Sequence, residues 1–239
     1  MKRERRYAIE AALAGAFSAV VRRLPRRLAL ALGRGLGRLW GALDKRHLRI
    51  AADNLRHAFP DWDEERVLRT ARGVYAHFGT ILFDILWMEG RTREELLAIT
   101  DVEGLDEARA AAASGRGVVA IVIDQNTQKK DGIFVEFFGR PACTTTVAAA
   151  LALKLDCLIV PVRCPLQPNG RYRMIYGPPV EWKGQGKGPD QVEALTQHLT
   201  TIIEGWVREY PEQWLWLHRR WKTQPEPEAP KADPPGGDA

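Results

Sequence analysis

Apolar residues recur at helical spacing through much of the first ninety positions. One stripe is made of leucines at positions 28, 32, 36, 39 and 43, and Arg34 and Arg38 lie together on another face. Pro25 suits the start of this helix, because a first-turn residue needs no amide hydrogen for the helix ladder. Two further stripes predict helices near residues 45–58 and 67–85. This part of the chain is therefore expected to be helical.

Shorter apolar runs alternate with turn residues in the rest of the chain. The β-branched run from Val118 to Ile123 predicts a strand that is buried on both faces. Further strands are predicted at residues 133–138, 158–162 and 171–176, and helices at 105–113, 144–154 and 192–206. This alternation favours an α/β domain in which a mixed sheet is flanked by helices.

Two polar sites have the spacing of helix caps. Asp61 and Glu64 predict a capping box, in which Asp61 accepts a hydrogen bond from the first turn and Glu64 reaches back. Thr144 or Thr145 is predicted to cap the helix that runs to Lys154. The amide groups at that helix end would suit a phosphate or an acyl phosphate.

Composition and charge point the N-terminal region toward a membrane surface. The chain has 239 residues, of which 45% are hydrophobic, and ten of its lysine and arginine residues lie among the first 38. Basic side chains interleaved with leucine favour an anionic lipid surface over a nucleic acid, because the apolar stripe also needs an apolar partner. A helix that packs on the protein's own core is the alternative.

A membrane-spanning helix is not predicted, because the chain has no run of about 18 uninterrupted apolar residues. The nearest candidate, residues 7–21, contains Glu10, which leaves a short or tilted span as the alternative to a surface anchor. We predict a basic amphipathic membrane-anchor region at residues 1–43, an α/β domain at 44–222 and a disordered tail at 223–239.

Three cysteines, Cys143, Cys157 and Cys164, include no C-x-x-C pair. Their odd number and spacing indicate reduced thiols facing a cytosol and argue against a disulfide framework or a zinc site. We interpret them as small buried apolar residues. No metal is therefore expected.

Candidate chemistry gathers after the predicted strand at residues 118–123. Asp124, Gln125 and Asn126 follow it directly, and Lys129 and Lys130 come next. Ligands of open α/β sheets bind beyond the carboxyl ends of strands, so we expect a site here. By contrast, His77 and Asp84 lie two turns apart on one helix, about 10 Å along its axis, which is too far for a base and the acid that orients it.

Five blocks of sequence together resemble the lipid A biosynthesis acyltransferases, the lauroyl and myristoyl transferases, and the related phosphatidylinositol mannoside acyltransferases. The blocks are residues 54–60, 123–126, 132–141, 159–162 and 211–222. The resemblance implies a glycerolipid-acyltransferase-like fold and a bacterial protein at the cytoplasmic face of the inner membrane. It implies transfer of a fatty acyl chain from acyl carrier protein or acyl-CoA to a hydroxyl of a membrane glycolipid, as in lipopolysaccharide synthesis, without a further cofactor and without nucleic acid.

The resemblance also implies a catalytic histidine and an acidic partner, and both are missing from this chain. In the family they lie on a strand that follows a turn like Gly115-Arg-Gly117, whereas here Val118 begins what resembles a later strand. Several dozen residues are absent at this junction, near residues 117–120. The residues five positions after the histidines are Ala52, Trp62, Leu82, Ile203 and Thr223, and none is acidic.

Loss of the base and of the strand around it predicts a chain with an incomplete sheet and no catalytic residues of the family type, which is inactive, poorly folded, or an artefact of a deletion or gene model. Its absence alone should lower the rate by about 10²- to 10⁴-fold. The surviving half of the cleft is predicted to bind an anionic substrate through Asp124, Gln125, Asn126, Lys129, Lys130, Arg140, Thr144, Arg163 and Arg173. The alternatives are that Asp124 caps a helix or turn and that the lysines and arginines are solvated surface charges. The alternative function is a non-catalytic protein that binds a membrane surface or anionic lipids.

Overall fold

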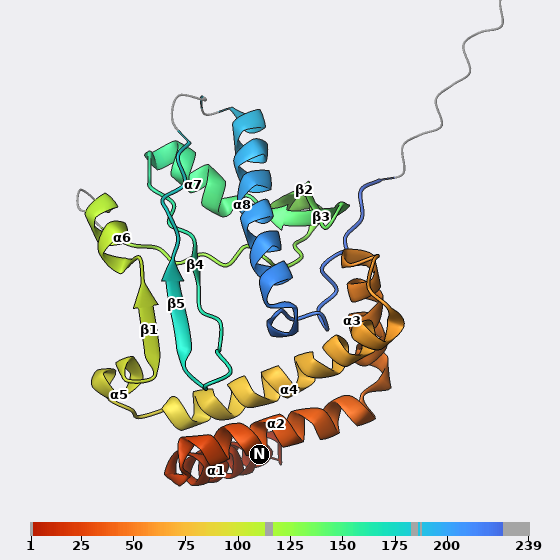
Figure 1. Ribbon diagram of the computed structural model, residues 1–239, viewed down its shortest axis with the longest axis vertical. Coiled ribbons are helices and arrows are strands. Elements are labelled where there is room, and N and C mark those ends of the chain that lie inside the picture. The colour runs from red at the N-terminus through yellow and green to blue at the C-terminus, as the bar shows by residue number, and fades with distance from the viewer. Residues whose placement is uncertain (1, 113–116, 183–185, 187, 227–239) are drawn as a thin grey trace, which may run out of the picture.

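A computed structural model describes residues 2–112, 117–182, 186 and 188–226 of the chain (Figure 1). Its α-helices are α1 (Lys2–Arg23), α2 (Arg26–Leu43), α3 (Lys45–Ala58), α4 (Glu64–Met88), α5 (Arg93–Leu97), α6 (Leu105–Ala111), α7 (Val147–Leu155) and α8 (Pro189–Glu209). Its strands are β1 (Thr100–Glu103), β2 (Gly132–Phe137), β3 (Arg140–Thr145), β4 (Val162–Arg163) and β5 (Tyr172–Tyr176). Short 3₁₀ turns occur at Lys129–Asp131 and Pro211–Gln213.

The strands form two small sheets in place of one continuous sheet. In the first, β5 lies between β1, to which it is parallel, and β4, to which it is antiparallel. The second is the antiparallel pair β2–β3, which packs beside α8 (Figure 1). The predicted mixed α/β character is confirmed, and helices flank both sheets.

Glycine and alanine form the face of α2 that packs on α4. Ala29, Gly33, Gly37 and Gly41 are buried, and a Cβ atom at Gly37 would overlap the backbone carbonyl of Tyr75 in α4. These glycines therefore allow a close approach of two helices, although glycine lowers intrinsic helix stability by roughly 1 kcal/mol relative to alanine. The predicted leucine stripe points away from α4 and is exposed.

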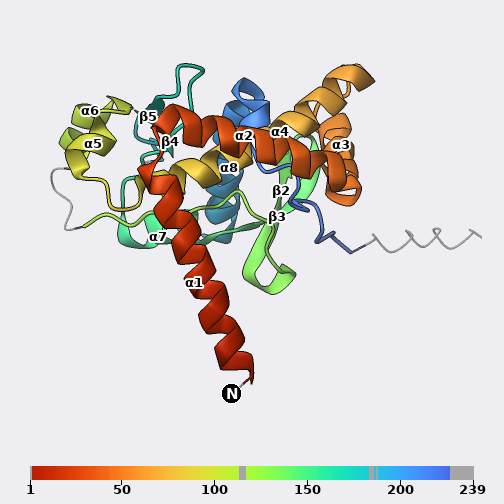
Figure 2. The ribbon, with the colours of Figure 1, turned by 90° about the horizontal axis from the view of Figure 1, so that it is seen from below.

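The N-terminal part of α1 projects away from the body of the protein (Figure 2). Only its C-terminal part is well packed, where Val21 is buried with Ala29 of α2 and Phe83 of α4. Apolar side chains earlier in the helix, such as Ile9 and Leu13, are exposed. None of the helices in the described ranges is both long enough and apolar enough to cross a bilayer.

The main hydrophobic core joins the helical half to the C-terminal segment. Leu55 of α3, Phe137 of β2 and Trp216 are each almost completely buried within it. Arg220 is buried at its edge, donates hydrogen bonds to the Cys143 carbonyl and to Thr144 Oγ1, and lies over the Phe137 ring. The C-terminal segment is thus held against α3 and the β2–β3 pair.

Most of the helices and two of the strands, β2 and β5, were predicted correctly, but α5, β1 and β3 were not predicted and two predicted strands were wrong. Residues 118–123 form no strand, and Val118, Val119 and Val122 are 91%, 76% and 73% exposed. The predicted strand at 158–162 is reduced to Val162–Arg163. The physical reason is that a strand needs a neighbour to accept its backbone hydrogen bonds, and no described strand pairs with residues 118–123.

Several local predictions were also wrong. α4 is capped by Asp63, whose carboxylate accepts from the Arg66 amide at 2.7 Å, so Asp61 is outside the helix. α7 begins after Thr146, because residues 140–145 are held in β3 by pairing with β2. Cys143 is buried as predicted, whereas Cys157 and Cys164 are exposed. Most of the predicted tail lies outside the described residues.

Candidate functional site

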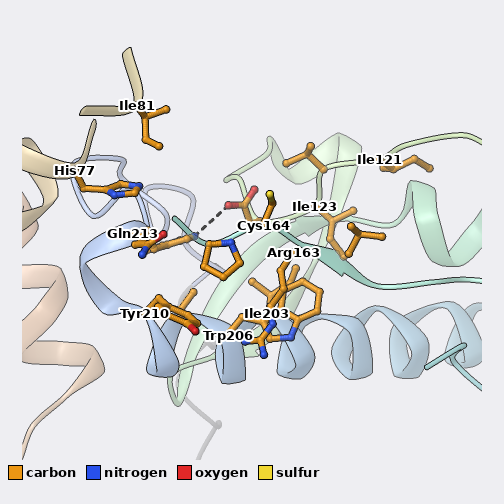
Figure 3. A pocket seen from close by; sticks show the side chains of 16 residues that line it. His77, Ile81, Ile121, Ile123, Arg163, Cys164, Ile203, Trp206, Tyr210 and Gln213 are labelled. Atoms are coloured by element: carbon orange, nitrogen blue, oxygen red, sulfur yellow. Dashed lines mark hydrogen bonds between the residues drawn. The ribbon is translucent and has the colours of Figure 1, made fainter. Parts of the chain in front are cut away.

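A cavity of about 360 Å³ opens between α4, α8, β4 and the irregular segment at residues 121–124 (Figure 3). Its wall is mainly apolar and aromatic, with side chains that include Ile81, Ile121, Ile123, Val162, Ile203, Trp206, Tyr210 and Trp214. The polar residues in this wall are His77, Asp124, Arg163, Cys164 and Gln213. The cavity therefore suits a mostly apolar ligand that carries a few polar atoms.

α8 provides one wall of the cavity through residues at helical spacing. Ile203 and Trp206 of α8, and Tyr210 directly after it, point toward the cavity (Figure 3). Arg163 of β4 crosses above them, with its guanidinium carbon 5.8 Å from the centre of the Trp206 ring and 5.9 Å from that of Tyr210. Arg163 also pairs with Glu209, which neutralises much of its charge.

Asp124 borders the cavity with one carboxylate oxygen bonded and the other unbonded. Oδ2 accepts a hydrogen bond from Trp214 Nε1 at 3.1 Å. Oδ1 is buried and has no hydrogen-bond partner among the described residues. Burial lowers the pKa of nearby Arg220 to about 10, and the negative charge of Asp124 opposes this shift. A ligand donor that reached Oδ1 would satisfy a buried acceptor, whose desolvation otherwise costs about 1–3 kcal/mol.

His77 of α4 is the histidine among the described residues that line this cavity. Burial, together with the positive charge of Arg34, lowers its pKa to about 4, so it is neutral at pH 7. Asp84 is fully buried elsewhere, where it accepts from Arg26 Nη2 at 2.6 Å and from the Tyr172 hydroxyl at 2.8 Å. This confirms that His77 and Asp84 do not form a base and acid pair.

The structure brings only some of the predicted binding residues together. Asp124 and Arg163 both line the cavity, and Asn126 lines a neighbouring hollow. The others lie elsewhere: Gln125, Lys130 and Arg140 are exposed, Lys129 pairs with Glu226, Arg173 pairs with Glu103, and Thr144 is buried against Arg220. The side-chain hydrogen bond to Glu103 raises the pKa of Arg173 above its ordinary value.

Trp206, Tyr210 and Gln213 were missed as cavity residues. Trp206 belongs to a helical apolar stripe, which the sequence indicated, but a stripe alone does not distinguish a core face from a cavity wall. Gln213 uses its amide to bond the backbone of Leu166, at 2.9 Å and 2.8 Å, and so anchors the segment that follows β4. Only the packing of α8 against β4 reveals these roles.

An α/β scaffold with an apolar cavity, and with a carboxylate and a guanidinium in the cavity wall, has the lining that suits a largely apolar ligand. Sequence comparison then places the chain within one family. It belongs to the bacterial lipid A biosynthesis acyltransferases, whose sequence profile matches residues 2–123 and, separately, residues 82–223.

Similar proteins include a lipid A biosynthesis lauroyltransferase of Escherichia coli K12, which is 30% identical over 159 residues, or 64% of this chain and 49% of the relative. A lipid A biosynthesis acyltransferase of Haemophilus influenzae is 25% identical over 163 residues, or 66% of this chain and 50% of the relative. A lipid A biosynthesis palmitoleoyltransferase of Escherichia coli K12 is 29% identical over 104 residues, or 43% of this chain and 32% of the relative. The chain thus spans about half the length of the first two relatives.

Proposed function

We propose that this chain is an acyltransferase by descent that binds a fatty acyl chain in the cavity but does not transfer it. The ancestral reaction would move an acyl chain from acyl carrier protein or acyl-CoA to a glycolipid hydroxyl in lipid A biosynthesis, at the cytoplasmic face of the bacterial inner membrane. The fold would be an incomplete version of the glycerolipid-acyltransferase type. The α/β part is residues 44–222, and the binding capacity resides in its apolar cavity.

One observation carries this proposal: the imidazole in the cavity wall is a weak base, and no carboxylate in the described part of the chain orients it. General-base catalysis is most effective when the pKa of the base lies near the working pH, and the pKa of His77 is about 4. Asp124 is bonded to Trp214 and not to His77. The cavity can therefore hold an acyl chain without efficiently deprotonating an acceptor hydroxyl.

A missing internal segment near residues 117–120 explains the loss of the base. The family profile matches the chain in two overlapping parts, residues 2–123 and 82–223, rather than in one uninterrupted match, and the proposed junction lies inside the overlap. Residues 117–124 also form no regular structure, although the β-branched run would suit a central strand. A neighbouring strand in the missing segment would have supplied the backbone partners for this run.

Asp124 and Arg163 are the predicted residues that we assign to the ligand in the cavity. Asp124 presents a buried acceptor for a hydroxyl or amide donor, and Arg163 can bind an anionic or carbonyl oxygen at the wall. Their roles are binding and orientation. The remaining seven predicted residues lie outside this cavity, so substrate contact with them would require a ligand that extends beyond it.

Acyl transfer by the full-length chain tests the proposal. The purified protein is incubated with a lipid A precursor and with acyl carrier protein that carries a labelled acyl chain. The acylated product is then quantified. We expect product only at background level, while a fluorescent fatty acid binds with a defined stoichiometry. Turnover above background that disappears in Asp124→Asn or His77→Gln would contradict the proposed inactivity. Absence of fatty-acid binding would contradict the proposed binding function.

A second function, docking on an anionic membrane surface, is favoured by the exposed face of α2. Because glycine and alanine pack on α4, the leucine stripe has no described protein partner and Trp40 and Leu43 are 63% and 69% exposed. Arg34 and Arg38 are exposed on the same helix. A helix with this division suits the interface of a bilayer, and we propose residues 1–43 as the anchor.

Flotation tests this second function. We expect the protein to float with phosphatidylcholine vesicles that contain phosphatidylglycerol, and Leu32→Ser, Leu36→Ser and Leu39→Ser together to reduce the floated fraction strongly. The matched control replaces three exposed leucines outside α2, by Leu97→Ser, Leu155→Ser and Leu158→Ser. Equal losses in both triple variants would contradict docking through α2.

A further inference from the structure

A second hollow, of about 420 Å³, lies between the first turns of α3 and the C-terminal segment. It is lined by Arg46, His47, Ile50, Asn126, Leu217, His218, Arg219 and Lys222. Three of these side chains are cationic, two are imidazoles, and none of the lining residues is acidic. Its chemistry therefore differs from that of the apolar cavity, although both are bordered by residues 124–126.

Hydrogen bonds hold the walls of this hollow in place. Asn54 of α3 donates from Nδ2 to the carbonyls of Trp216 at 2.8 Å and His218 at 3.2 Å, which ties the C-terminal segment to the helix. The Asn126 side chain donates to Thr223 Oγ1 at 3.0 Å and accepts from the Thr223 amide at 3.1 Å. The hollow is thus formed before any ligand arrives, which reduces the entropy lost on binding.

His218 is held by the same network as a neutral side chain. Its Nε2 accepts a hydrogen bond from the Asn126 amide at 3.3 Å, so Nδ1 carries the ring proton. Burial and the neighbouring Arg220 lower the pKa of His218, which favours this neutral form at pH 7. The positive charge of the hollow therefore comes mainly from the arginines and the lysine.

The three cations of the hollow contrast with other arginines of the protein. Arg56 pairs with Glu64, Arg171 with Asp101 and Arg173 with Glu103, each at 2.6 Å. Arg46, Arg219 and Lys222 form no ion pair with any residue in the described ranges. Two acids act on the imidazoles of the hollow: Asp44 bonds His47 at 2.8 Å, and the negative charge of Asp124 acts on His218. The three cations outnumber these two acids.

We propose that this hollow binds the phosphate group of a phosphate ester. Arginine presents paired N–H donors that match the oxygens of phosphate, and lysine adds a mobile point charge. A single phosphate occupies only part of the hollow, so the rest accommodates the group to which the phosphate is attached. This inference does not depend on acyl transfer or on fatty-acid binding in the apolar cavity.

Calorimetry with the full-length chain in zwitterionic micelles tests the site. The first probe is glycerol 3-phosphate, and the second is phosphatidic acid in phosphatidylcholine vesicles, with phosphatidylcholine alone as the reference. The test variant is Arg46→Gln, Arg219→Gln and Lys222→Gln. Its matched control, Lys45→Gln, Arg49→Gln and Arg72→Gln, removes the same charge from exposed positions that do not line the hollow.

We expect the test variant to raise the Kd by at least about tenfold, because charge-assisted hydrogen bonds are lost. The control should change the Kd by less than about threefold, because solvent and salt screen more distant charges. Binding of glycerol 3-phosphate identifies a soluble phosphate ester as a ligand, and specific binding of phosphatidic acid alone identifies a lipid headgroup. Either result, with loss in the test variant only, supports the site.

Two outcomes would overturn the proposal. One is absence of specific binding of both probes to the unaltered chain, and the other is an equal loss of affinity in the test and control variants. Lys222→Glu, a single substitution at an exposed position, separates an effect on binding from an effect on folding. It should weaken binding while leaving the thermal unfolding midpoint within about 2 °C, since isolated surface changes have small effects on stability.

Discussion

The two hollows of this protein share the segment at residues 124–126 but differ in how their charges are compensated. In the apolar cavity, Arg163 is paired with Glu209 and His77 is neutral. In the basic hollow, Arg46, Arg219 and Lys222 have no carboxylate partner in the described part of the chain. This difference suits the apolar cavity to a hydrocarbon and the basic hollow to an anion, although Asp124 at the first and Asn126 at the second are only two positions apart in the chain.

Filling the apolar cavity should separate the two sites most strongly. Ile203→Trp places an indole in the space that a fatty acyl chain would occupy, and we expect fatty-acid affinity to fall by about a hundredfold or more. Displacement of a fluorescent fatty acid measures this effect, and Ile203→Leu, which conserves volume, is the control. Affinity for glycerol 3-phosphate should be unchanged, and a parallel loss at the basic hollow would show that the sites are not separate.

The wall that α4 contributes to the apolar cavity depends on the close packing of α2. Gly37→Ala places a methyl group against the Tyr75 carbonyl and should lower the free energy of unfolding by about 2 kcal/mol through overpacking. Gly35→Ala, on the open side of the same helix, has no atom nearby and should raise it by about 0.5–1 kcal/mol. Urea unfolding of both variants checks the opposite signs, and similar effects would contradict the packing role of the glycine face.

His77 should make the stability of the apolar cavity region sensitive to acid. Its pKa is about 4 in the folded protein and about 6.5 when unfolded, so the unfolded chain binds more protons between these values. Stability is therefore fully present above pH 6.5 and falls as pH decreases toward 4, by roughly 2 kcal/mol after allowance for partial exposure. Urea unfolding across this range measures the slope. His77→Gln should flatten it, and an unchanged slope in that variant would rule out His77 as its source.

Loosening the wall of the basic hollow should have the smallest of these effects. Asn126→Ala removes both side-chain bonds to Thr223, and we expect about tenfold weaker binding of glycerol 3-phosphate because the hollow is less preorganised. Calorimetry measures this change, and Gln128→Ala, at a nearby exposed position, is the control. Fatty-acid affinity should stay constant. A loss confined to fatty-acid binding would reverse the assignment of Asn126.

Features that depend on neighbouring residues in the chain were predictable. The helices containing Leu55, Val74 and Leu199 follow from apolar spacing, because each helix satisfies its own backbone and needs a partner only for its apolar face. The same spacing did not reveal which face of α2 is buried. The leucine stripe was assigned to a lipid surface, with packing on the core as the alternative, and the small side chains of Gly33 and Gly37 were not recognised as the face that α4 approaches closely.

Features that depend on distant partners were not predictable. The run from Val118 to Ile123 has strong strand character but remains irregular, because no described strand pairs with it. Among the predicted site residues, the positions of Asp124 and Arg163 at one cavity depend on how β4 packs against α8. Arg173 and Thr144 were expected at the same site, but Glu103 and Arg220 hold them elsewhere.

The sequence by itself determined most of the helices, the leucine stripe of α2 and the family. These properties are local, or depend only on which residues are present. Tertiary structure alone decided which charges are paired, which polar atoms are buried and where the two hollows lie. Those properties arise from contacts such as Asn54 with Trp216 and Trp214 with Asp124, which join residues 162 and 90 positions apart in the chain.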